Sequence, residues 1–333
     1  MNISQKIIYY YRNILKREPD EEGFQHYLQK IKSEELTLND LKTVFENSDE
    51  YKILKSMEKV DQIPTKIKEG FMMYLNPTDR IVSYLIFRNK EWESNETFIF
   101  KKFLKENSIY VDIGSNLGYF SLIAGSIAKN GKVFSFEPVK QNFRLLEKNI
   151  RKNNLTNVQI FQYAISNKNG FVNIFSGEST SNARLFKSDL EGYMEQYQST
   201  ELVKCVTLDT ILDTIPGNSN IPNIIKMDIQ GGEMLALKGM KNIIHKTNEL
   251  VLFTEFWPEA ITLTKESPHD FLQLLLDLNF KIYDIDIKTK KIIKKSITQL
   301  LEDYPVGKYM SQTNLLCLKN TNFPESLSHL LAI

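Results

Sequence analysis

The stretch Ser108-Ile-Tyr-Val-Asp-Ile-Gly-Ser-Asn-Leu-Gly118 decides the fold of this chain. It begins as an apolar run that ends in Asp112 and Gly114, and the next residues, LGYFSLIAGSIA, place apolar side chains at helical spacing. This pattern predicts a buried strand that turns through glycines into a helix. Glycines permit the sharp turn and a close approach of a ligand to the backbone, and the helix start offers unpaired N–H donors. The spacing G-x-x-x-G, with Asn116 inside it, differs from the G-x-G-x-x-G fingerprint and disfavours a nicotinamide dehydrogenase.

Further apolar runs downstream predict more strands of the same kind. They are KVFSFEP (132–138), VQIFQYAI (158–165), NIIKMDI (223–229) and ELVLFTEFW (249–257), with helical segments between them. Strands that alternate with helices predict an α/β fold whose mainly parallel sheet has helices on both faces. Ligands of such sheets bind outside the carboxyl ends of the strands, so we expect the functional site there.

Composition narrows the function classes. The 333 residues are 42% hydrophobic and 25% charged, which is typical of a globular protein with a large domain and a small one. Lys and Arg (42) balance Asp and Glu (41), so nothing indicates a nucleic-acid partner. No apolar stretch is long enough for an integral membrane span, and no signal-peptide pattern opens the chain. We therefore expect a cytoplasmic protein in which Cys205 and Cys317 are reduced and buried.

Glu137 supplies the second functional signal, because it closes the strand after the glycine loop. A carboxylate in this place can accept hydrogen bonds from both hydroxyls of a ribose. Together with the loop it predicts a cofactor that contains a nucleoside. The alternative is an ordinary solvated carboxylate at a strand end.

The motifs VDIGSNLGYFSLIA, GKVFSFEP, VTLDTIL, IIKMDIQGGEMLALKGM and TNLLCLK resemble the FkbM-type S-adenosylmethionine-dependent methyltransferases, over about residues 70–320. The resemblance implies a class I methyltransferase (Rossmann-like) fold with a seven-stranded sheet whose last strand is antiparallel. It also implies S-adenosyl-L-methionine as cofactor and S-adenosyl-L-homocysteine as product. Members are generally regarded as O-methyltransferases that act on sugar or natural-product hydroxyls.

The resemblance assigns residues to parts of the cofactor. The methionine portion would be surrounded by Asp112, Gly114, Ser115, Asn116 and Gly118. Glu137 would hold the ribose, and Ala164 and Ile165 would lie near the adenine. Asn167 stands where the family commonly has an aspartate, and its amide can still hydrogen-bond to the cofactor.

The segment Lys226–Glu233 should lie beside the transferred methyl group. Methyl transfer from a sulfonium needs alignment of donor and acceptor and removal of a hydroxyl proton, but in principle no metal. Gln230 replaces the glutamate that the family usually has, so we predict Asp228 as the group that orients or deprotonates the acceptor. Asp228 could instead cap glycine-rich backbone or contact the cofactor's ammonium. Glu255 is a second catalytic candidate at the same end of the sheet.

Three further residues are candidates for acceptor binding: Gln230, Glu233 and Trp257. The aromatic face of Trp257 could support a sugar ring. For Glu255 and Trp257 the alternatives are a structural hydrogen-bond acceptor and a core residue. No acidic or amide pair follows the fifth strand and no two histidines have ligand spacing, so we predict no metal.

The N-terminal part differs from the rest. We predict a small helical module over residues 1–58 and a helical lead-in over 59–107. The methyltransferase domain is expected over residues 108–322. The pattern from Tyr11 to Tyr27 and the sequence NSDEY (47–51) resemble a small phycobilisome-linker-like domain of unknown function. We interpret the module as one that docks a protein partner or self-associates.

The leading hypothesis is therefore methyl transfer to a hydroxyl of a saccharide, glycan precursor or related small molecule. A non-catalytic cofactor- or glycan-binding adaptor is the alternative. Methylation of nucleic acid or protein is disfavoured, because the Asn-Pro-Pro-aromatic motif is absent and the charge is balanced. Residues 176–201, with Arg184, and 288–308 are the expected variable walls of the acceptor pocket.

Overall fold

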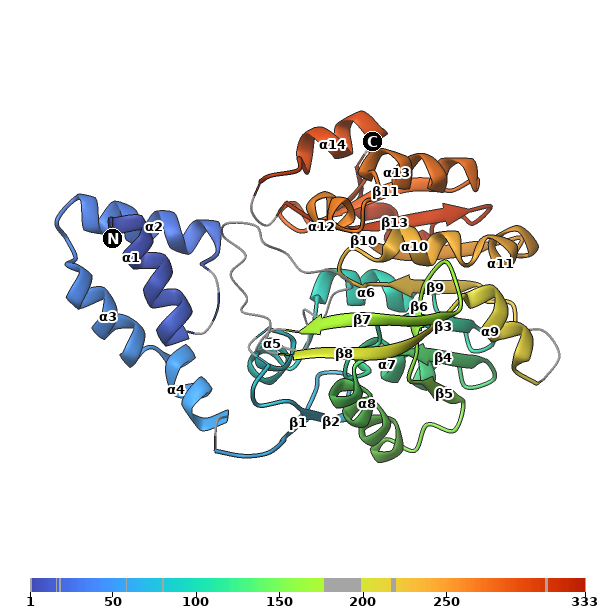
Figure 1. Ribbon diagram of the computed structural model, residues 1–333, viewed down its shortest axis with the longest axis horizontal. Coiled ribbons are helices and arrows are strands. Elements are labelled where there is room, and N and C mark those ends of the chain that lie inside the picture. The colour runs from blue at the N-terminus through green and yellow to red at the C-terminus, as the bar shows by residue number, and fades with distance from the viewer. Residues whose placement is uncertain are drawn as a thin grey trace.

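The computed structural model describes residues 2–15, 17, 19–57, 59–79, 81–176, 199–216, 220–308 and 311–332. Most of the expected pocket wall at 176–201, including Arg184, lies outside the described residues. Figure 1 shows a helical part at one side of a larger α/β part.

The helical module forms its own small core. Its elements are α1 (Ile3–Tyr10), a π-helical turn (Tyr11–Leu15), α2 (Glu21–Lys32), α3 (Leu38–Asn47) and α4 (Asp49–Met57). The side chains of Asn2, Asp20 and Thr37 cap the first three helices, as residues with a short polar side chain do at helix starts. Arg17 Nε donates to Glu50 Oε1 (2.6 Å), so the two halves of the N-terminal motif meet in space.

Residues 59–107, the lead-in segment, contain more than the helices that were expected. A hairpin of β1 (Ile63–Lys66) and β2 (Met72–Leu75) precedes α5 (Val82–Asn89) and α6 (Ser94–Phe103). Alternate residues of β1 are buried, which is the pattern of a strand with one face covered. Met73, Ile99 and Tyr110 belong to one hydrophobic cluster, so the lead-in segment packs into the same core as the sheet.

One large sheet organises the α/β part. Within the described residues its order is β14-β12-β11-β13-β10-β9-β3-β4-β5. The strands are β3 (Ile109–Ile113), β4 (Lys132–Phe136), β5 (Val158–Phe161), β9 (Ile224–Met227), β10 (Leu250–Phe256), β11 (Lys281–Asp286), β12 (Lys291–Lys294), β13 (Thr313–Lys319) and β14 (Leu331–Ala332). In this sheet order, the seven neighbouring strands β11-β13-β10-β9-β3-β4-β5 confirm the predicted sheet. Of these, β13 is antiparallel to both of its neighbours, β10 and β11.

Two strands extend the predicted seven. The chain reverses after β11, where Asp286 Oδ1 accepts the N–H groups of Lys288 (2.7 Å) and Thr289 (3.0 Å), and it returns as β12. This turn falls in the segment that was expected to form a variable pocket wall. Asp-centred turns of this type support hairpins, and β14 then adds to β12 in parallel.

Helices cover both faces of the sheet, as predicted. They are α7 (Tyr119–Ile127), α8 (Lys140–Lys152), α9 (Leu208–Thr214), α10 (Glu233–Lys238), α11 (Lys241–Lys246), α12 (Pro258–Leu263), α13 (Pro268–Asp277) and α14 (Ile297–Asp303). A short 3₁₀ turn (Glu325–Leu330) follows. Along β3, Tyr110 packs into one hydrophobic cluster, and Val111 and Ile113 pack into the other. Both cysteines are free and buried, as expected.

The run 158–165, predicted as one strand, is divided between two sheets. It continues after β5 as β6 (Ala164–Ile165), which pairs with β8 (Ser199–Val206) in a small sheet completed by β7 (Gly170–Ser176). Among the helices that the structure describes, none has the length and apolar character needed to cross a bilayer.

The turn after β3 packs closely against the residues that follow β9, and Gly114 is the point of contact. Substitution of Gly114 therefore tests this packing. The φ of Gly114 is +84°, and a Cβ there would lie 2.1 Å from the carbonyl oxygen of Asp228. Gly70 has a similar φ of +90° but nothing within 4 Å of the same position. We expect Gly70→Ala to lower the free energy of unfolding by about 1–2 kcal/mol through its φ alone. Gly114→Ala should lower it by clearly more, as urea denaturation would measure, and an equal effect of the two changes would contradict the close contact.

Candidate active site

The carboxyl ends of β3 and β4 build the loop that the sequence singled out. The N–H groups of Gly114 and Ser115 both donate to the carbonyl oxygen of Phe136, over 2.9 and 3.0 Å. Gly118 has a φ of +88° and precedes α7 directly. The loop therefore lies at the sheet edge where the parallel fold was expected to bind its ligand.

Glu137 holds this loop in place. One carboxylate oxygen accepts the N–H of Asn116 and the other accepts the N–H of Val139, each over 2.9 Å. The residue is only 4% exposed, so the alternative of a solvated strand-end carboxylate is wrong. Burial raises the pKa of Glu137 to about 7, against the effect of the backbone donors.

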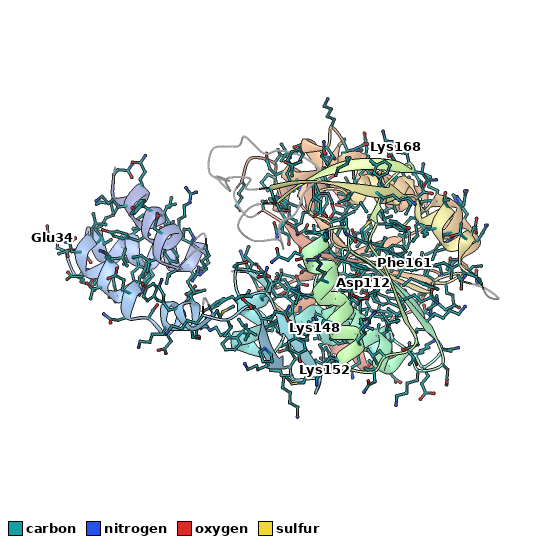
Figure 2. The ribbon with its side chains drawn as sticks, turned by 60° about the horizontal axis from the view of Figure 1, so that its bottom comes forward. Glu34, Asp112, Lys148, Lys152, Phe161 and Lys168 are labelled. Carbon is teal, nitrogen blue, oxygen red and sulfur yellow. The ribbon has the colours of Figure 1, made fainter. Side chains whose placement is uncertain are left out.

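Asp112 is only 2% exposed, and Figure 2 labels it near the middle of the larger part. Its Oδ2 accepts the hydroxyl of Ser121 on α7 over 2.5 Å, and Ser121 also bonds to Ser135 on β4 over 2.8 Å. Burial raises the pKa of Asp112, while Ser121 and the charge of Lys226 act in the opposite direction. Asp112 thus links β3 to α7, and its contact with a cofactor stays a prediction.

The residues expected near the adenine lie in the small sheet. Ala164 and Ile165 form β6 and are buried, whereas Asn167 is exposed just beyond it. Ser166 donates its hydroxyl to the side-chain oxygen of Asn167 over 3.4 Å. Their contacts with a cofactor likewise stay predictions.

The two predicted catalytic carboxylates meet at the ends of β9 and β10. Gln230 Nε2 donates to Asp228 Oδ1 (3.1 Å) and to both oxygens of Glu255 (3.3 and 3.1 Å). These three residues are called the strand-end cluster below. Gln230 adopts a left-handed backbone with φ of +55°, which turns its amide back between the carboxylates. Burial, followed by the charge of Asp228, raises the pKa of Glu255 well above its ordinary value.

Lys226 is a site residue to which the sequence assigned no role, although it opens the segment expected beside the methyl group. It lies on β9 with only 3% exposure, and its Nζ is 3.4 Å from both Asp228 Oδ2 and Glu96 Oε1. The ring of Phe120 lies 4.6 Å from the same ammonium. Burial alone would lower the pKa of Lys226, but the surrounding carboxylates, Glu96 first, raise it well above its usual value. The lysine therefore stays charged and fixes Asp228.

Glu93, Glu96 and Asn314 were also missed, and they connect the lead-in segment to the cluster. Asn314 Nδ2 donates to Glu93 Oε1 (3.1 Å) and to Glu96 Oε2 (2.5 Å). Asn314 faces Glu255 across the pairing of β13 with β10. In the sequence, Asn314 stands in the family motif TNLLCLK, and both glutamates fall inside the range of about residues 70–320 that resembles the family, but neither observation assigned them a role.

A family model described as the methyltransferase FkbM domain matches residues 112–282, slightly more than half of the chain. The chain belongs to the FkbM methyltransferase family. A second model, of a domain of unknown function (DUF4214), matches residues 4–54 in the helical module. The strand order of the seven central strands is that of the predicted class I methyltransferase fold.

Individual relatives are distant. Methyltransferase 1 of Beauveria bassiana is 22% identical over 192 residues, which cover 53% of this chain and 74% of that protein. The hexuronic acid methyltransferase AglP of Haloferax volcanii is 27% identical over 148 residues, which cover 44% of this chain and just over half (56%) of AglP. The solved structure of methyltransferase FkbM from Methylobacillus flagellatus aligns with a TM-score of 0.39 at 14% identity, over 93% of this chain and 58% of that one.

S-adenosylmethionine is the cofactor of this FkbM methyltransferase. An observation on the loop after β3 supports this cofactor independently of the family match. Asn116 has a φ of +50°, and its Oδ1 is buried without a hydrogen-bond partner among the described residues. A buried acceptor of this kind calls for a donor from a ligand, since buried polar atoms are normally paired.

Glu233 and Trp257 occupy positions unlike those expected of acceptor-binding residues. Glu233 is fully buried, and its two oxygens accept the N–H groups of Ile229 (2.9 Å) and Gly231 (2.8 Å). It therefore holds the loop that carries Gln230. Trp257 is 4% exposed and packs against Ala260 of α12, which fits the core alternative. Among the described residues no group of three or more His, Cys, Asp or Glu is arranged to hold a metal.

Lys226→Met should test how far the buried ammonium stabilises this FkbM methyltransferase. The change leaves the carboxylates of Glu96 and Asp228 without their cation, so the free energy of unfolding should fall by about 3–5 kcal/mol. Lys281→Met, at an exposed position on β11, should change it by less than about 0.5 kcal/mol. The double variant Glu96→Gln/Lys226→Met should lose less free energy of unfolding than the sum of the losses in the two single variants. Urea denaturation measures all of these values. A loss no larger than that of Lys281→Met would show that the pairs are not stabilising.

Proposed function

We propose that this chain transfers the methyl group of S-adenosylmethionine to a hydroxyl of a saccharide or a related small molecule. The observation that carries the proposal is the strand-end cluster. Its Asp228 side chain is 27% exposed, whereas Glu255 is 5% exposed and the neighbouring Lys226 is buried. Asp228 is thus the carboxylate of the cluster that an acceptor hydroxyl can reach. The similarity to AglP, a hexuronic acid methyltransferase, supports a sugar as acceptor.

Some of these residues would bind the cofactor, and others would act on the acceptor. S-adenosylmethionine supplies a methyl group on a sulfonium, which an acceptor oxygen can displace. Glu137 would accept hydrogen bonds from the ribose hydroxyls, and Asn116 Oδ1 would accept one from a cofactor donor. A carboxylate oxygen of Asp228 would take the proton of the acceptor hydroxyl, held in place by Lys226 and Gln230.

The non-catalytic adaptor remains the second candidate, because the amide of Gln230 fills the space between Asp228 and Glu255. Turnover decides between the two candidates: formation of S-adenosylhomocysteine on a hydroxyl acceptor supports the enzyme, and cofactor binding without turnover on a panel of saccharides supports the adaptor. For the helical module, docking or self-association stays our prediction, and its phycobilisome-linker-like resemblance rests on the sequence motif alone.

Asp228→Asn should separate chemistry from cofactor capture. The amide cannot take the hydroxyl proton, so we expect kcat/KM to fall by about 10²–10⁴-fold while the affinity for S-adenosylhomocysteine stays within a few-fold. Asp61→Asn, at an exposed aspartate between α4 and β1, is the matched control and should keep full activity. Full turnover in Asp228→Asn would exclude Asp228 as the base.

The raised pKa of Glu137 predicts how cofactor binding depends on pH. Only the ionised carboxylate can accept a hydrogen bond from both ribose hydroxyls, and it is lost as the pH falls through about 7. The affinity for S-adenosylhomocysteine should therefore fall about tenfold between about pH 8 and about pH 6. Titration calorimetry at both pH values measures this, and Glu137→Gln should bind weakly with little pH dependence. A flat profile in the unaltered protein would contradict the role of Glu137.

A further inference from the structure

A hollow lies next to the strand-end cluster. It has a volume of about 510 Å³, within the range of pockets that bind small molecules. Its wall comes from the lead-in segment, from the carboxyl end of β11 and from β13. The residues used below are Lys68, Glu91, Glu93, Glu96, Ile287 and Asn314, and the hollow is called the acidic pocket.

The inner wall of the acidic pocket touches the residues of the proposed reaction. Asn314 bonds to Glu93 and Glu96 on the pocket side and lies opposite Glu255 in the sheet. Glu96 in turn pairs with Lys226, which pairs with Asp228. A ligand in the pocket would therefore lie beside the cluster, as the part of an acceptor next to its reacting hydroxyl would.

The charge of the lining is unbalanced. Lys68 pairs with Glu91, and Lys226 pairs with Glu96. Glu93 forms no ion pair in the described part of the chain, and its Oε2 is buried without a hydrogen-bond partner there. Burial and the charge of Glu96 raise the pKa of Glu93 well above its ordinary value. A cation placed near Oε2 would relieve both the repulsion and the missing hydrogen bond, whereas an added carboxylate would increase the repulsion.

We propose that the acidic pocket is an acceptor subsite for a hydroxyl-rich group that carries a protonated amine, such as an amino sugar, and that it disfavours a sugar carboxylate. The apolar side chain of Ile287, which is 70% exposed, supplies a surface for the C–H face of a ring, and the amine would bind to Glu93. This inference rests on the proposed function, because it treats the pocket as part of the acceptor site. It also sets this chain apart from AglP, which is named as a methyltransferase of an acidic sugar, a hexuronic acid.

The test compares three matched probes: glucosamine, N-acetylglucosamine and glucuronic acid. Binding is measured by titration calorimetry with saturating S-adenosylhomocysteine, at about pH 6.5, where a sugar amine is largely protonated. We expect glucosamine to bind at least about tenfold more tightly than glucuronic acid, with N-acetylglucosamine between them. The preference should shrink with added salt, because it is electrostatic. Glucosamine that binds no better than glucuronic acid would overturn the proposal.

Variants of the pocket test whether Glu93 causes the preference for glucosamine. Glu93→Gln keeps the shape and the contact to Asn314 but cannot ionise beside a bound amine, so it should bring glucosamine and N-acetylglucosamine to within about threefold. Glu249→Gln, an exposed glutamate before the amino end of β10 and so at the opposite edge of the sheet, is the control and should leave the preference unchanged. An unchanged preference in Glu93→Gln would overturn the assignment of the amine to this pocket.

Two controls keep the outcomes distinct. Affinity for S-adenosylhomocysteine is measured on every variant, and if Glu93→Gln loses it, Glu91→Gln replaces it with the same expected direction. Failure of the unaltered protein to bind S-adenosylhomocysteine would overturn the proposed function itself. Normal cofactor binding without an amine preference would overturn only the subsite.

Discussion

The buried ammonium of Lys226 is the interaction on which the site depends. A charge removed from water is tolerated only when opposite charges surround it closely, and here they come from different parts of the chain. Glu96 belongs to α6 of the lead-in segment, and Asp228 follows β9 in the centre of the sheet. The lysine therefore couples the position of the lead-in segment to the geometry of the proposed base. A shift of α6 away from the sheet would leave Lys226 and Asp228 mismatched, so this segment is part of the site rather than a covering for it.

The central sheet could be predicted from the sequence because its strands are continuous apolar runs, and such runs are local features. The turn after β3 was predictable for the same reason, since its glycines and the acidic residue at the end of the next strand stand at fixed places in a strand–turn–helix unit. Where local signals competed, the prediction was less accurate. The run 158–165 has the same apolar character throughout, but its last two residues pair with β8 instead of β4. The apolar pattern of a strand does not indicate which other strand it will pair with.

Asp228 and Glu255 could be placed at one edge because both follow strands of the sheet, but contacts between these strand ends and the lead-in segment could not be predicted. Asn314 bonds to Glu96 across 218 positions of sequence, and no periodicity carries such a contact. Glu96 lies in the first turn of α6, where an acidic side chain is common because it complements the helix dipole, so its residue type alone does not mark it as a buried partner of Lys226. Glu233 shows the opposite case: its place in a conspicuous motif suggested contact with a ligand, but both its oxygens bind backbone N–H groups. A motif indicates where residues gather, and only the fold shows which way each side chain turns.

The two outer strands of the large sheet have a consequence for self-association. A sheet edge exposes a row of unpaired backbone N–H and C=O groups, to which another chain can add a strand. Here β5 spans four residues at one edge and β14 two residues at the other. An edge of two residues offers too few groups to hold an added strand in register, and its addition to β12 covers part of a longer edge. The extension of the sheet beyond the predicted seven strands thus leaves β14, rather than the four-residue β12, at that side of the sheet, which limits edge-to-edge aggregation.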